Sequence, residues 1–296
     1  MKVAAIIQAR MSSIRMPGKA MRPICGTPMI GLLLKRVANA KLIDQIVLAT
    51  SNDPCNDSLA KYVQELGYVV FRGSEKDVLD RYYKAAKEIE ADAVVRVTGD
   101  SPLIDPALID EAIKKFLDEN IDYVSNITPA TYPDGLDIEV ISFKALETTW
   151  KVAKVSKERE HVTPFIRESG KFSLRNFAND LDFSEERWTV DEPEDFEVVE
   201  KVFKHFHPSL SFSWLEIMSL NKKHPEWFAT NRHLARNEGS ELSIGQKLWK
   251  RAKRIIPGGN MLLSKRAEML LPGQWPAYFK KSKGCYSNSF NCRHFL

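Results

Sequence analysis

Three cationic side chains, spaced five and four residues apart, lie in one short stretch near the start of the chain. They are Arg10, Arg15 and Lys19, and they follow an apolar run at residues 2–7. Arginine offers phosphate oxygens a planar fork and lysine offers a point charge, so the stretch is suited to a polyphosphate. Free backbone N–H groups and two hydroxyl side chains would complete a phosphate cradle, the hydroxyls being those of Ser12 and Ser13.

The position of this basic loop favours a binding site over a solvated surface loop. Residues 2–7 have the pattern of a strand buried on both faces, and open α/β sheets bind ligands at the carboxyl ends of their strands. Pro17 and Gly18 shape the turn before Lys19. The loop has neither the Walker A pattern nor Gly-x-Gly-x-x-Gly, which counts against P-loop NTPases and dinucleotide-binding dehydrogenases.

Two aspartates lie just past later predicted strands. Asp100 follows the apolar run at 93–97, and Asp191 follows a shorter run. Mg²⁺ takes oxygen ligands and is commonly held by one or two carboxylates and substrate phosphates, so both residues are candidate metal ligands. The alternatives are a turn cap for Asp100 and a helix N-cap for Asp191. We interpret Asp195 as helix surface.

Other polar residues allow two interpretations each. Asp137 and Glu139 are two residues apart, so on a strand both point to one face, where they would bind sugar hydroxyls or a metal, or simply face solvent. His161 titrates near neutrality and is either a sugar-binding or acid/base group or a structural residue. Ser74 to Asp77 resembles a capping box that begins a helix beside Arg72.

Alternating strands and helices must position these residues. Their spacing predicts an α/β fold with a mostly parallel sheet flanked by helices, and the pattern changes after about residue 130. We expect strands at 2–7, 45–50, 68–70, 93–97, 122–125, 136–141, 171–177 and 187–190, and helices at 29–39, 53–66, 74–89, 105–119, 142–153, 158–168 and 193–206.

Charge divides the 296 residues into two parts. Residues 207–296 hold 15 Lys/Arg and 5 Asp/Glu, whereas residues 1–206 hold 28 and 34. We therefore expect a nucleotide-binding domain at 1–206, a connector at 207–242 and an irregular or helical extension at 243–296. The basic excess comes without a zinc, RNP or helix-turn-helix pattern, so no nucleic-acid partner is expected.

Neither a membrane nor an oxidising compartment is indicated. No run approaches the roughly 20 apolar residues that span a bilayer, and no signal-peptide cleavage site follows the first strand. The cysteines have no metal or disulfide-framework spacing, which is typical of free thiols in a reducing cytoplasm. They are Cys25, Cys55, Cys285 and Cys292.

In their order and composition these segments resemble the cytidylyltransferases, which include CMP-Kdo synthetase, the acylneuraminate cytidylyltransferases and the branch of spore coat polysaccharide biosynthesis protein F. The resemblance runs through residues 1–206. It is carried by Ile6-Ile7-Gln8-Ala9-Arg10, Pro17-Gly18-Lys19, Val97-Thr98-Gly99-Asp100-Ser101-Pro102, Pro133-Asp134-Gly135-Leu136-Asp137, Glu158-Arg159-Glu160-His161 and Thr189-Val190-Asp191-Glu192-Pro193.

The resemblance implies a Rossmann-like nucleotide-diphospho-sugar transferase fold and Mg²⁺-dependent transfer of CMP from CTP to an acidic sugar in cell-surface polysaccharide biosynthesis. It implies catalytic roles for Arg10, Lys19 and Asp100, and metal binding by Asp100 and Asp191. It implies sugar contacts from Asp137, Glu139 and His161, with a dimer surface as the alternative for His161 and a homodimer left open. The implied nucleotide contacts are Ala9, Arg10, Ser12, Ser13, Arg15, Lys19, Arg72 and Thr98.

A second, shorter resemblance concerns the C-terminal extension. Residues 248–286 are similar to the N-terminal arm of class III aminotransferases of the glutamate-1-semialdehyde aminomutase type. The large domain that binds pyridoxal phosphate is absent, so we expect neither that cofactor nor aminotransferase activity. Two other functions stay open: a glycosyltransferase of the same fold, with Asp137 and Glu139 as its metal motif, and a non-catalytic scaffold.

Overall fold

The computed structural model describes residues 1–234, 236, 279–283 and 286–289. One compact unit comprises Met1–His233 and a second comprises Leu234–Leu296. In the second unit, β10 (Phe279–Lys283) and β11 (Tyr286–Ser289) form an antiparallel ribbon. Most of the aminotransferase-like stretch lies outside the described residues, and the proposed division of the chain at 206 and 242 stays a prediction.

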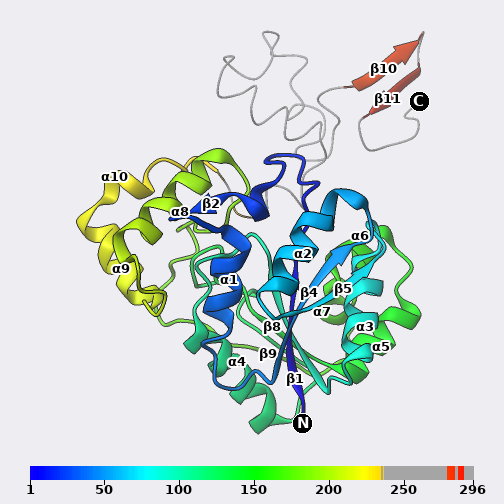
Figure 1. Ribbon diagram of the computed structural model, residues 1–296. Coiled ribbons are helices and arrows are strands. Elements are labelled where there is room, and N and C mark those ends of the chain that lie inside the picture. Colours follow the sequence, from blue (N-terminus) through cyan, green and yellow to red (C-terminus); the bar gives the residue numbers. More distant parts are fainter. Residues whose placement is uncertain (235, 237–278, 284–285, 290–296) are drawn as a thin grey trace. The chain divides into compact units, whose positions relative to one another are not determined.

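A seven-stranded sheet organises the first unit, in the order β5-β4-β1-β6-β8-β7-β9 (Figure 1). Strand β8 runs antiparallel to β6 and β7, and the other neighbours in this sheet are parallel. The prediction of a mostly parallel α/β sheet is confirmed. The strands are β1 Val3–Gln8, β4 Gln45–Ser51, β5 Val69–Gly73, β6 Ala93–Thr98, β7 Tyr123–Ser125, β8 Glu139–Ser142 and β9 Leu174–Asn176, beside a small ribbon of β2 Pro23–Ile24 and β3 Thr27–Pro28.

Helices cover both faces of the sheet, which is why its central strands are mostly apolar on both faces. Successive side chains of a strand point to opposite faces. Ala5 and Ile7 share one core cluster with α1, α2, α4 and α8, and Ala4 and Ile6 share another with α3, α5 and α7. The helices are α1 Met29–Val37, α2 Asp57–Glu65, α3 Val78–Glu88, α4 Pro106–Glu119, α5 Phe143–Val152, α6 Ser156–His161, α7 Pro164–Glu168, α8 Pro193–Phe206, α9 Trp214–Lys223 and α10 Pro225–Phe228, with 3₁₀ turns η1 Lys19–Met21 and η2 Pro54–Asn56.

None of the helices in the described part of the chain is both long and apolar enough to cross a membrane. Helices α9 and α10 fall in the segment expected to be a connector, and their apolar side chains join the core that α8 also lines. Figure 1 shows them beside α8.

Arg36 ties this C-terminal part to the sheet domain. Its guanidinium is fully buried and donates to the carbonyl groups of Ile104 at 2.9 Å, Leu210 at 2.6 Å and Phe212 at 3.0 Å. It also lies 4.0 Å above the Phe212 ring. Burial lowers the pKa of Arg36 to about 10, although the negative charges of Asp105 and Glu216 act in the opposite direction. A single cation therefore joins α1, the segment before α4 and the segment before α9.

Two predicted boundaries differ from the structure because side chains satisfy the backbone locally. Helix α3 begins at Val78 with Asp77 as its N-cap, whose carboxylate accepts from Asp80 N at 2.9 Å, so the prediction of Ser74 as N-cap is wrong. Strand β8 begins at Glu139 and not at residue 136. Before it, the Asn126 side-chain amide bonds the N–H and C=O groups that a neighbouring strand would otherwise pair with. It accepts from Ile138 N at 2.9 Å and donates to Leu136 O at 2.8 Å.

The strand predicted at 187–190 is not formed. Within the described chain the segment makes one isolated bridge, Asp134 with Arg187. Its N–H groups instead bond two loops of the candidate site: Trp188 N donates to Asp134 O, and Val190 N to Asp100 O, both at 2.7 Å. The apolar pattern of the segment reflects the burial of Trp188 and Val190 between loops.

Candidate active site

The loop after β1 is held in shape by contacts at both ends. Met11 N donates to the Asn56 side chain at 2.8 Å, and Gly18 N closes the loop onto Met11 O at 2.9 Å. Gly18 has φ of 73°, a left-handed conformation that glycine adopts without strain. The loop that carries the predicted phosphate-binding residues is therefore a defined turn at the carboxyl end of the sheet.

Lys19 lies between the two aspartates predicted to hold a metal. Its Nζ is 3.0 Å from Asp191 Oδ1 and 3.5 Å from Asp100 Oδ2, and it donates to Val190 O at 2.6 Å. Arg15 Nη2 is 2.8 Å from the same Asp191 oxygen. The fold thus brings together four predicted residues from three distant segments.

Arg10 is held on the other side of the loop by an acid that sequence reasoning did not single out. Its Nη1 is 2.8 Å from Glu75 Oε1, and Ser12 Oγ donates to the same oxygen at 2.6 Å. Burial raises the pKa of Glu75, but hydrogen bonds from Ser12 and Ser51 and the charge of Arg10 outweigh it, so the pKa lies below its usual value. Ser13 is half-buried in the same loop, and Ala9 is buried beneath it.

Asp100 is placed by close approach between neighbouring strand ends. Gly99 N donates to Gln8 O at 2.8 Å, and a Cβ at Gly99 would lie 2.6 Å from the Ala9 Cβ and 2.7 Å from Gln8 O. Only glycine therefore fits there without a shift of β1. The Asp100 carbonyl accepts from Val190 N at 2.7 Å, which fixes the distance between the Asp100 and Asp191 loops.

The Asp191 carboxylate is not used as a helix cap. The N-cap of α8 is Glu192, and the backbone N–H groups of Asp191 and Glu192 donate to Asp195 at 2.9 and 3.0 Å. Burial raises the pKa of Asp191, but the charges of Lys19 and Arg15 outweigh it and hold that pKa below its usual value. Asp191 is therefore an ionised carboxylate directed at the cations.

Asp195 is fully buried, so its interpretation as helix surface is wrong. It accepts from Arg187 Nε at 2.8 Å and Nη2 at 2.9 Å, and from the Asn231 amide at 2.8 Å. The available signal was its spacing: an acid three residues after the residue that precedes a helix is a capping pattern. Arg187 and Asn231 had no comparable local signal, because their partners are set by the fold.

Glu139 is a buried ion-pair partner. It is 2% exposed, pairs with Arg96 on the neighbouring strand and accepts from the Tyr123 hydroxyl. Burial raises the pKa of Glu139, but the charge of Arg96 and the bond from Tyr123 outweigh it and keep the carboxylate ionised. Asp137 lies before the strand and is half-buried, so the two acids do not share the strand face expected from their spacing.

The remaining candidates lie at the edges of this arrangement. His161 ends α6 and is half-buried; burial and the nearby positive charges lower its pKa, so the imidazole is neutral near pH 7. Arg72 pairs with Asp57 at 2.6 Å and donates to Ser51 O at 3.1 Å. The Thr98 hydroxyl is 3.1 Å from that of Ser101. Ligand contacts from these residues stay predictions.

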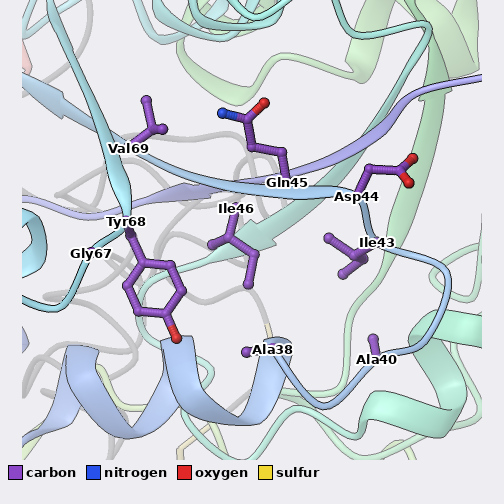
Figure 2. A pocket seen from close by; sticks show the side chains of 9 residues that line it. All are labelled: Ala38, Ala40, Ile43, Asp44, Gln45, Ile46, Gly67, Tyr68 and Val69. Atoms are coloured by element: carbon purple, nitrogen blue, oxygen red, sulfur yellow. The ribbon is translucent and has the colours of Figure 1, made fainter.

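A cavity elsewhere does not coincide with this site. It has a volume of about 310 Å³ and lies at the amino ends of β4 and β5, where Gln45 and Val69 begin those strands. Figure 2 shows Tyr68 next to Ala38 at the end of α1, and Ile43 on the side away from Tyr68. The candidate active site is at the opposite ends of the strands, so this cavity plays no part in it.

Comparisons with known proteins place the chain in a family. The cytidylyltransferase family model matches residues 4–212. The chain is 38% identical over 209 residues to an uncharacterized protein of Methanocaldococcus jannaschii, covering 70% of this chain and 85% of that protein. It is 31% identical over 229 residues to spore coat polysaccharide biosynthesis protein SpsF of Bacillus subtilis, covering 75% of this chain and 94% of that protein.

A shorter match is to 3-deoxy-manno-octulosonate cytidylyltransferase of Geobacter metallireducens, 42% identical over 115 residues, covering 38% of this chain and 44% of that one. Among solved structures, a cytidylyltransferase from Leptospira borgpetersenii superposes with a TM-score of 0.74 at 34% identity, covering 77% of this chain and 97% of that one. The chain therefore belongs to the cytidylyltransferase family and is a nucleotidyltransferase.

Proposed function

We propose that this protein transfers CMP from CTP to a hydroxyl group of an acidic sugar, releases pyrophosphate, and does so in the cytoplasm as a step in cell-surface polysaccharide synthesis. The observation that carries the proposal is the Lys19 ammonium between Asp100 and Asp191, at the end of a loop that carries two further cations, Arg10 and Arg15. The acidic sugar is supported by relatives named for 3-deoxy-manno-octulosonate, and the pathway by one named for spore coat polysaccharide.

The donor set fits Mg²⁺. Asp100 and Asp191 both approach one Lys19 nitrogen, and their side chains are 29% and 21% exposed, so an ion beside them can keep water and phosphate ligands. Within the described residues no group of three or more His, Cys, Asp and Glu forms a complete protein cage. Two carboxylates completed by phosphate oxygens is the arrangement that Mg²⁺ favours.

The protein residues would act on the triphosphate by positioning and charge. Bound Mg²⁺ would neutralise phosphate charge as the bond to pyrophosphate breaks. When the ion binds, it would replace Lys19 as the counter-charge of the two carboxylates. The Lys19 ammonium could then move away from them and bond a phosphate oxygen. Arg10 and Arg15 would exchange Glu75 and Asp191 for phosphates in the same way, and Ser12 and Ser13 would donate hydrogen bonds.

The sugar would enter beside β6 and β8. Its hydroxyl oxygen would attack the α-phosphorus and lose its proton to solvent water, while the P–O bond to the β-phosphate breaks. Pyrophosphate would then leave without a covalent enzyme intermediate. Asp137 and His161 are the proposed sugar contacts. Glu139, the third predicted contact, is 2% exposed and pairs with Arg96, so we propose no direct sugar contact for it. Ala9, Arg72 and Thr98 are the proposed contacts to the nucleoside.

A glycosyltransferase of the same fold is disfavoured by the Arg96–Glu139 pair. Such an enzyme would use Asp137 and Glu139 together as its metal motif, but Glu139 is 2% exposed and neutralises a buried arginine. Removing it from Arg96 to bind a metal would leave an uncompensated buried charge, which costs several kcal/mol.

The test is pyrophosphate release from CTP with a panel of sugars. We expect release with Mg²⁺ and one or more 2-keto-3-deoxy sugar acids, and none with the corresponding neutral sugars. The Asp100→Asn variant should fold normally and lose the activity. Release with neutral sugars alone would contradict the acidic substrate, and full activity of Asp100→Asn would contradict the metal assignment.

A further inference from the structure

A buried polar network lies directly behind the Asp191 carboxylate. Arg187 is its centre: Nη1 is 3.0 Å from Asp134 Oδ2, Nε is 2.8 Å from Asp195 Oδ1, and Nη2 is 3.5 Å from Asp191 Oδ2. The Arg187 side chain is 6% exposed and that of Asp195 fully buried, so these charges have little solvent to screen them. The network is therefore sensitive to the loss of any partner.

Asp195 links the network to the position of Asp191. Both carboxylate oxygens accept from Arg187, Oδ1 from Nε at 2.8 Å and Oδ2 from Nη2 at 2.9 Å. Oδ2 also accepts from the backbone N–H of Asp191 at 2.9 Å and of Glu192 at 3.0 Å. Rotation of this carboxylate would break both backbone bonds at once. The direction of the Asp191 side chain therefore depends on how firmly Asp195 is held.

Asn231, which follows α10, holds Asp195 from a distant part of the chain. Its amide nitrogen donates to Asp195 Oδ1 at 2.8 Å and to Arg187 O at 3.0 Å, so both of its hydrogen atoms are used. The residue is 1% exposed. These two bonds connect the Asn231 amide to the residues directly behind Asp191.

We propose that Asn231 is a positioning residue for Asp191, acting through Asp195 and Arg187, so that the segment after α10 sets the affinity for the divalent metal. This inference rests on the proposed function, in which Asp191 is a metal ligand. Without the amide, the buried Arg187 carbonyl and Asp195 Oδ1 each lose a donor. The Asp195 carboxylate is then held less firmly, by Arg187 and by the backbone N–H groups of Asp191 and Glu192. Residues that orient a metal ligand typically contribute 10- to 100-fold to metal affinity.

The experiment measures the contribution of the metal to nucleotide binding. Calorimetry on the full chain gives the Kd of CTP in EDTA and the Kd of Mn²⁺·CTP. The first Kd divided by the second is the factor by which the metal tightens nucleotide binding. The variant is Asn231→Ala. The matched control is Asn221→Ala, because Asn221 is also buried and donates to Glu186 at 2.8 Å, next to Arg187 but outside the network.

We expect Asn231→Ala to lower the ratio roughly tenfold or more and Asn221→Ala to leave it unchanged, both in protein that is fully folded by thermal denaturation. Asn231→Ser keeps one hydroxyl donor and should fall between wild type and Asn231→Ala; it replaces the alanine variant if that one does not fold. A structural role alone would lower the melting temperature and leave the ratio untouched.

Two failures are distinguishable. If Asp191→Ala abolishes the metal-dependent ratio and Asn231→Ala keeps it, the positioning role is wrong and the metal assignment stands. In a second case the metal does not tighten CTP binding to wild type, or it tightens binding equally in wild type, Asp100→Ala and Asp191→Ala. The metal assignment in the proposed function is then wrong, and the positioning role is overturned with it.

Discussion

At the scale of single residues, the Arg96–Glu139 pair shows how a tertiary contact decides what an acid does. Arg96 and Glu139 are direct partners in the register of β6 and β8, and a tyrosine hydroxyl bonds the carboxylate from β7. The sequence pattern placed Glu139 on a polar strand face but could not identify what covers that face. A helix-covered sheet turns such a face into core, where charges must be paired.

We predict that Glu139→Gln lowers the free energy of unfolding at pH 7 by about 3 kcal/mol or more, because Arg96 is left buried without a counter-charge. The folded-state pKa of Glu139 lies below its ordinary value of 4.5, so its stabilising effect is full above that pH and is lost as the pH falls through the folded pKa. Urea unfolding at pH 7 and at a series of pH values below 4.5 measures both effects.

The control for this variant is Glu65→Gln, which removes an acid from an exposed i,i+4 pair with Lys61. Exposed pairs on a helix surface contribute little, so its stability should hardly change at any of these pH values. Equal stability losses for the two variants at pH 7, or a loss for Glu139→Gln that does not shrink in acid, would contradict the assignment of a buried ionised pair.

At the scale of elements, Asp-Pro pairs predict two helix starts. In the structure the two aspartates differ in the number of backbone groups that they bond. Asp53 accepts from Cys55 N at 2.9 Å and begins η2 at the surface. Asp105 accepts from Ala107 N at 2.8 Å and begins α4, but its second oxygen accepts from Trp214 N at 2.7 Å in a buried position. Asp105 therefore anchors α9 as well as capping α4.

Asp105→Ala should destabilise the protein by about 2–4 kcal/mol, from the lost cap of about 1 kcal/mol and the unsatisfied Trp214 N–H of about 1–3 kcal/mol. Asp53→Ala, which removes only a surface cap, should have a much smaller effect. Chemical denaturation of both variants gives the comparison. Equal effects would show that the bond from Trp214 contributes nothing to stability.

Local sequence signals predicted elements better than their long-range partners. The helix predicted at 193–206 matches α8, since Pro at the start and the apolar spacing are local features. The strand expected at 187–190 failed because the backbone of that segment bonds two loops instead of a neighbouring strand. Elements whose hydrogen bonds go to distant loops are not visible in a period-two pattern.

At the scale of the whole molecule, the site too was predictable only where local sequence signals existed. The residues that the fold brings to one point, Lys19, Asp100 and Asp191, could be predicted because each follows a strand-like run and such ends meet at one edge of a sheet. Of the residues that hold them, Asp195 had a local signal in its capping spacing, but Arg187 and Asn231 had none, because their partners in the buried network are set by packing. Arg36, which joins three separate segments, was missed for the same reason.

The most direct test of the central claim is thermal denaturation with CTP, UTP, ATP and GTP, each with and without Mg²⁺, on wild type and Asp100→Ala. A ligand at about 100 times its Kd adds roughly 2.7 kcal/mol to the folded state. We predict a shift in Tm that is selective for CTP, enhanced by Mg²⁺ in wild type and not enhanced by Mg²⁺ in Asp100→Ala. No shift with any triphosphate in a cooperatively melting protein, or the same Mg²⁺ enhancement in Asp100→Ala, would contradict a CTP-binding site built on Lys19, Asp100 and Asp191.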